Sequence, residues 1–126
     1  MQKRWYFMML AIAVILCAAT LIQASDTPPG IADKQTVTFS SPTLVGGTLL
    51  PAGEYKVLHT MNGNEHIMVF KGMYGTKGEA KAKCNLVPLT AKATRTELRY
   101  TENAKNEHIL QEMTFKGDTA KHVLEP

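Results

Sequence analysis

Apolar side chains recur at every second position along much of the chain from Lys34 onward. A period of two is typical of a half-buried β-strand, whereas an amphipathic helix repeats every three to four residues. Residues 80–86 show the pattern most clearly, because small or apolar residues alternate there with polar ones. These inward-facing residues are Ala80, Ala82, Cys84 and Leu86. The frequent Thr, Val, Tyr and Phe also suit a pleated sheet, so the chain is predicted to be all-β.

Eight strands are expected, most of them separated by Gly or Pro. They cover residues 34–40, 43–50, 54–61, 65–71, 79–87, 94–102, 107–116 and 119–124. Residues 94–112 also contain Glu, Lys and Leu, which favour a helix, so a helix is the alternative for that stretch. The pattern predicts an antiparallel β-sandwich or barrel-like sheet of seven to eight strands, preceded by an N-terminal signal helix. The strands form a single domain over residues 34–126.

The first 24 residues have the order of segments found in a secretory signal peptide. Lys3 and Arg4 give a basic start, an apolar run follows from residue 5 to residue 16, and the rest is small and mostly uncharged. Cleavage is expected after Ala24, with Ala19 as the alternative position.

Two other fates of this segment are open. An uncleaved anchor is one, because the apolar run approaches the about 20 residues that span a bilayer. A lipid-modified Cys17 is the other, and it fits less well because Leu16 stands where that processing requires a small residue. In each case residues from Ser25 onward are expected outside the cytoplasm, in the periplasm or the extracellular space. Residues 25–33, with two prolines and a glycine, are expected to be a flexible lead-in.

The charge of the chain belongs partly to this N-terminal segment. Loss of Lys3 and Arg4 lowers the formal net charge from +3 to +1. A nearly neutral domain gives no reason to expect nucleic acid as a partner. A membrane is a partner only if the N-terminal segment is retained.

Two turns are indicated by their residues. Pro51 and Gly53 in Leu-Pro-Ala-Gly favour a type I turn with a bulge, which would pair residues 48–49 with residues 55–57. Asn62-Gly63 favours a type I′ hairpin. Counting outward from that turn places His59 opposite His66, with Val57 opposite Met68 and Tyr55 opposite Phe70.

The run TLVGGTLLPAGEYKV, from Thr43 to Val57, carries a resemblance to known proteins. Its Leu-Pro-Ala-Gly-x-Tyr turn resembles the edge hairpin of several exported bacterial β-sandwich modules. The longer stretch from Val45 to Tyr55 is similar to that of small uncharacterised exported proteins of bacteria. The resemblance implies an exported β-sandwich, and it brings no catalytic residue with it.

His59 and His66 are the sharpest candidates for a binding site. Opposed Cβ atoms in a sheet lie about 4.5–5.5 Å apart, which allows two imidazoles to bind one metal ion. Met61 and Met68 fall on the same predicted face, and thioethers with imidazoles suit copper, with zinc as the other candidate. The alternative is a partly exposed histidine pair near the hairpin tip, which acid would loosen by charge repulsion.

Cys84 is the one cysteine after residue 24, and its place on the apolar side of a strand predicts a buried free thiol. Gly72, Gly75 and Gly78 lack the pattern of a phosphate-binding loop and indicate a connector. The chain contains no Gly-x-Ser-x-Gly, no His-Glu-x-x-His and no dinucleotide fingerprint. No catalytic residue is assigned, an enzyme is not expected, and no cofactor is expected other than copper or zinc.

These observations predict a small exported β-domain that acts as a binding or structural module of the cell envelope. Its partner would be a protein or another envelope component. The alternative is a periplasmic metal-handling protein that uses His59 and His66 to bind copper or zinc.

Overall fold

A computed structural model describes residues 30–126, which form nine β-strands and no helix. The strands are β1 (Lys34–Phe39), β2 (Thr43–Val45), β3 (Thr48–Leu50), β4 (Gly53–Asn62), β5 (Glu65–Gly72), β6 (Glu79–Pro88), β7 (Glu97–Glu102), β8 (His108–Thr114) and β9 (Ala120–Leu124). The all-β prediction is confirmed for this part of the chain, and the helical alternative for residues 94–112 is wrong. Among residues 30–126 no helix is long and apolar enough to cross a membrane. The predicted signal peptide, its helix and its cleavage sites lie outside the described residues.

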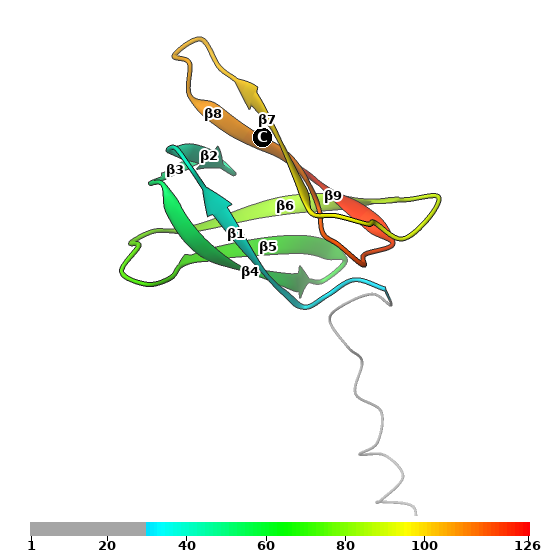
Figure 1. Cartoon of the computed structure of the whole chain (residues 1–126). Helices are drawn as coiled ribbons and strands as arrows, with labels where there is room; N and C mark the ends of the chain where they lie inside the picture. The colour runs from blue at the N-terminus through cyan, green and yellow to red at the C-terminus, as the bar shows by residue number, and fades with distance from the viewer. Residues whose placement is uncertain (1–29) are drawn as a thin grey trace, which may run out of the picture.

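All nine strands belong to one sheet with the order β1-β4-β5-β6-β9-β8-β2-β3, and β7 pairs with β8. Neighbours run antiparallel except for β2 and β8, which are parallel. The sheet is strongly curled, as Figure 1 shows: β4, β5 and β6 lie below, β7 and β8 lie above, and β9 connects the two parts. The curl brings Phe39 of β1 to Tyr100 of β7, with ring centroids 6.4 Å apart, although these strands are not neighbours in the sheet order.

The core lies inside the curl and is centred on aromatic side chains. Phe39, Tyr55 and Phe70 are almost fully buried, and the ring centroid of Phe39 is 5.3 Å from that of Tyr55 and 6.3 Å from that of Phe70. The inward positions of β6 alternate as expected, since Ala80, Ala82 and Cys84 are buried between exposed lysines. Ala80 is the partner of Phe70 in the β5–β6 register, and its small side chain leaves space beside that ring.

The expected strand over residues 43–50 is instead a hairpin of two short strands, which gives nine strands in place of the predicted seven to eight. Gly46 and Gly47 have φ values of 56° and 84°, and positive φ at both central positions is the geometry of a type I′ turn. Because β3 pairs with β2, the predicted pairing of residues 48–49 with residues 55–57 is wrong. The segment around Pro51 instead passes the chain to β4, and the Tyr55 hydroxyl donates a hydrogen bond of 2.6 Å to the Pro51 carbonyl.

The register of the β4–β5 hairpin differs from the prediction by two residues. Asn62 pairs with Glu65, Met61 with His66 and His59 with Met68. The central turn residues are Gly63 and Asn64, and Gly63 takes φ of 62° at the first of these positions, as in a type II′ turn. A shift of two residues keeps every side chain on its predicted face. His59 and His66 therefore share a face, but as diagonal neighbours rather than as an opposed pair.

Gly46 and Gly47 offer a matched test of how the β2–β3 turn packs. A Cβ added at Gly46 would overlap the carbonyl oxygen of Lys81 on β6, whereas one at Gly47 meets nothing within 4 Å. Positive φ strains alanine at both sites by roughly 1–3 kcal/mol. The difference in stability between the two variants therefore measures the cost of the overlap with the Lys81 carbonyl oxygen. We expect Gly46→Ala to lower the free energy of unfolding by about 2 kcal/mol more than Gly47→Ala, measured by urea denaturation. Equal losses would contradict the packing of this turn on β6.

Candidate metal centre

Three histidines and a cysteine gather on the inner face of four adjacent strands. His59 comes from β4, His66 from β5, Cys84 from β6 and His122 from β9, and these strands are consecutive in the sheet. His66 stands opposite Cys84 in the β5–β6 register, and His122 is two positions from Leu124, the partner of Cys84. The period of two then turns all four side chains toward the same side.

The donor atoms of His59, Cys84 and His122 all lie within 4.8 Å of one another. The Nδ1 atom of His122 is 3.9 Å from the Sγ atom of Cys84. Metal–nitrogen bonds of about 2.0–2.1 Å and a metal–sulfur bond of about 2.3 Å place neighbouring ligand atoms roughly 3.3–3.8 Å apart. A contraction of up to about 1.5 Å, within reach of side-chain rotation, would therefore bring the three donor atoms onto one ion.

Burial sets the chemistry of these donors. The residues His59, Cys84 and His122 are 5%, 4% and 1% exposed. His59 Nδ1 is buried without a hydrogen-bond partner among residues 30–126, while its Nε2 lies 3.1 Å from Nδ1 of His66. Because an unpaired buried polar atom costs about 1–3 kcal/mol, an unpaired nitrogen on an imidazole that packs against a thiol and a second imidazole suggests a ligand for a cation.

Asp118 orients His122 from behind. Its Oδ2 atom lies 3.4 Å from His122 Nε2, and its Oδ1 atom accepts a hydrogen bond of 3.3 Å from the backbone N–H of Ala32. An ionised carboxylate only accepts, so His122 Nε2 carries the hydrogen and Nδ1 presents its lone pair toward Cys84. A carboxylate behind a histidine is the usual outer partner of a metal-bound imidazole.

The same burial shifts the pKa values of the three donors. Desolvation, together with the nearby imidazoles, lowers the pKa of His59 to about 4, and desolvation followed by the charge of His66 lowers that of His122 to about 4. Desolvation, with a smaller contribution from Glu125, raises the pKa of the Cys84 thiol to about 11. At neutral pH both imidazoles are therefore neutral and able to bind a metal, and the thiol still holds its proton.

A pocket of about 270 Å³ lies beside Cys84 and His66. Its lining residues are Asn64, Glu65, His66, Lys83, Cys84, Asn85 and Glu125. Cys84 and His66 form its inner part, because they are the less exposed of these residues. Lys83 and Glu65 form an exposed ion pair of 3.1 Å beside it.

The sequence brings His59 and His66 together correctly, since their ring centroids are 5.0 Å apart. Met68 is buried opposite His59, and Met61 is half-buried opposite His66. Cys84 has the buried free thiol that the alternation predicts.

Sequence reasoning missed His122 and Asp118. The alternation of residues 120–124 marks His122 as inward-facing, but only the pairing of β6 with β9 brings it to Cys84. The fourth described histidine, His108, lies away from the cluster, beside Glu102 and Ser41.

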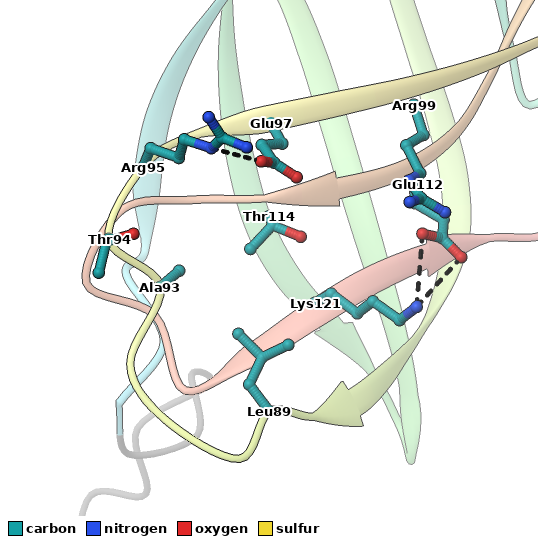
Figure 2. Close-up of a pocket in the computed structure, with 9 residues that line it drawn as sticks. All are labelled: Leu89, Ala93, Thr94, Arg95, Glu97, Arg99, Glu112, Thr114 and Lys121. Atoms are coloured by element: carbon teal, nitrogen blue, oxygen red, sulfur yellow. Dashed lines mark hydrogen bonds and ion pairs between the residues drawn. The ribbon is translucent and has the colours of Figure 1, made fainter.

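A larger hollow of about 550 Å³ lies over β7, β8 and β9 (Figure 2). Its charged side chains are mostly paired with each other, Arg95 with Glu97 and Lys121 with Glu112. None of its lining residues is buried. It is a solvated surface rather than a built site.

Comparison with protein-family models, curated proteins and solved structures gives no match to this chain.

Proposed function

We propose that this protein is an exported β-sandwich domain that binds one transition-metal ion, zinc or copper, through His59, Cys84 and His122. The observation that carries the proposal is the convergence of three buried donor atoms within 4.8 Å, beside an unpaired imidazole nitrogen. Export rests on the sequence of the first 24 residues, and the sandwich rests on the strong curl of the nine-stranded sheet. His66 is the natural fourth ligand, because it contacts His59 and stands opposite Cys84 in the β5–β6 register.

The donor set favours zinc or copper over harder ions. Thiolate and imidazole ligands select zinc and copper, whereas magnesium and calcium prefer oxygen ligands. The carboxylate of Asp118 already faces His122, so it supports a ligand instead of serving as one. Neutral imidazoles need no proton removed before they bind.

Metal titration with matched variants tests the proposal. We expect the purified protein to bind one equivalent of Zn(II) or Cu(I), with affinity measured by competition against a chelator of known affinity. Cys84→Ser and His122→Gln should each lose at least about tenfold in affinity, and Asp118→Asn should lose roughly 10–100-fold. His108→Gln, a histidine outside the cluster, is the control and should bind as the wild type does. Wild-type affinity in Cys84→Ser and His122→Gln, with folding checked by circular dichroism, would refute the site.

Proton release on binding gives a second prediction. At pH 7.5 the thiol of Cys84, with a pKa of about 11, is protonated, while His59 and His122, with pKa values of about 4, are neutral. Binding should therefore release about one proton per ion, and the affinity should rise about tenfold per pH unit between about pH 6.5 and 8.5. Calorimetry in buffers of different ionisation enthalpy measures the release. A value near zero would show that the thiol is not a ligand.

Binding of an envelope protein at an edge of the sheet is a second candidate function. Strand β3 lies at one end of the sheet order, and its Leu49 is 49% exposed. An edge strand with an exposed apolar side chain can accept a strand of a partner. Co-purification from envelope fractions that is lost in Leu49→Lys, while Tyr74→Lys retains it, would support this role.

A further inference from the structure

We propose that the ion is copper and that the site exchanges one electron, cycling between Cu(II) and Cu(I). This inference rests on the proposed function. Two imidazoles and one thiolate are the ligands of the trigonal copper sites that transfer electrons, in which a thioether is often a weak additional ligand. His59, His122 and Cys84 provide the first three ligands. Met68, buried and directly opposite His59 in the β4–β5 register, provides a thioether on the same face.

The strands that carry the proposed ligands suit electron exchange because they belong to one sheet. His59, Cys84 and His122 come from β4, β6 and β9, which are held in one hydrogen-bonded sheet, rather than from separate loops. His122 is further fixed by Asp118 behind it and by the Phe115 ring, whose centroid is 5.5 Å away. Once they bind the ion, ligands on strands held in one sheet change little in position between the two oxidation states, so little rearrangement opposes the transfer.

The pocket brings a redox partner close to the ion. Cys84 and His66 both line it, and His66 contacts His59. A one-electron reductant seated over the pocket would therefore lie next to a residue that contacts the proposed ligands. The step is the transfer of one electron from this reductant to Cu(II), which gives Cu(I) and the oxidised reductant, and a one-electron oxidant then takes the electron and restores Cu(II). No bond to the ligands is broken, Cys84 remains a thiolate, and no proton is transferred.

Reconstitution with copper tests this inference directly. The protein is loaded with Cu(I) without oxygen, oxidised with ferricyanide, and then reduced with ascorbate. We expect an intense visible band from charge transfer between the Cys84 thiolate and Cu(II), which ascorbate removes and ferricyanide restores over repeated cycles. Cys84→Ser should lose the band, and His108→Gln should keep it.

Parallel titration with Zn(II) separates this inference from the proposed function. If Zn(II) binds at the cluster but copper gives only the weak absorption of nitrogen- and oxygen-bound Cu(II), the electron-transfer inference is overturned and metal binding stands. Oxidation of Cys84 during the first cycle, detected as loss of a titratable thiol after the metal is removed, would also overturn it. If Zn(II) and Cu(I) bind no more tightly than they do to Cys84→Ser, both proposals fail.

Discussion

The metal-free protein is expected to lose stability steeply as the pH falls from about 6.5 to about 4. Burial holds the pKa values of His59 and His122 at about 4 in the folded state, against 6.5 for an ordinary histidine. Within this window the unfolded chain binds protons that the native state does not, so acid favours unfolding. The stability contributed by the two neutral histidines is fully present above about pH 6.5 and levels off at its lowest below about pH 4.

The size of this effect matters because small domains are marginally stable. A pKa difference of one corresponds to about 1.4 kcal/mol, so two histidines whose pKa values fall from 6.5 to about 4 account for at most about 7 kcal/mol. That loss approaches the whole stability of many domains, about 5–15 kcal/mol. Urea unfolding in the presence of a chelator, at intervals from pH 7.5 to pH 4, measures it.

Neighbouring groups modify the acid response without reversing it. The positive charge of His66 opposes protonation of both buried histidines, whereas Asp33 and Asp118 favour protonation of His59. Burial raises the pKa of Asp118 itself, and a raised carboxyl pKa stabilises the folded state as the pH falls, so it offsets part of the loss.

Single-residue variants test which histidines cause the loss of stability in acid. His122→Gln should remove about half of the pH-dependent loss, whereas the half-exposed His108 can be changed to Gln without effect. If the free energy of unfolding falls with pH equally in the wild type, His122→Gln and His59→Gln, the account is contradicted. The loss of stability in acid would then arise outside the cluster.

The second large effect is stabilisation by the metal. An ion that binds only the folded state adds about 4 kcal/mol when its free concentration is 1,000 times Kd. For a domain of this size the melting temperature should then rise by roughly 15–30 °C, and a chelator should reverse the rise. The ion also competes with protons for His59 and His122, so the acid-induced loss of stability should move to lower pH.

Cys84→Ala is the informative variant for the metal effect. Alanine removes one proposed ligand and leaves a small apolar side chain in the core, so the metal-free domain should fold with a modest loss of stability. Most of the rise in melting temperature should disappear in this variant and persist in His108→Gln. An undiminished rise in Cys84→Ala would mean that the ion binds elsewhere, for example at surface carboxylates.

Much of the fold follows from local patterns. The alternation of apolar and polar residues over 80–86 predicts which side chains of β6 face inward. The Gly and Pro positions predict most strand limits to within a residue or two. The shared face of His59 and His66 also follows, because a register error of two residues leaves the face unchanged. These features depend only on residues close together in the sequence.

The turn type of the β4–β5 hairpin and the pairing of β6 with β9 are not determined by local sequence patterns. Asn62, Gly63 and Asn64 fit two different two-residue turns, and positive φ at Gly63 alone selects the type II′ form. The meeting of Cys84 with His122 requires β6 to pair with β9, across 38 residues of sequence. No period in the sequence specifies that pairing, so the place of His122 beside Cys84 could not be predicted from local sequence.

X-ray absorption spectroscopy of the protein loaded with one equivalent of Zn(II) tests the central claim most directly. The account predicts one sulfur ligand at about 2.3 Å and two or three imidazole nitrogens at about 2.0–2.1 Å. It also predicts that the sulfur contribution is absent in Cys84→Ser. A wild-type spectrum with only nitrogen and oxygen ligands would contradict the assignment of His59, Cys84 and His122 as a metal centre.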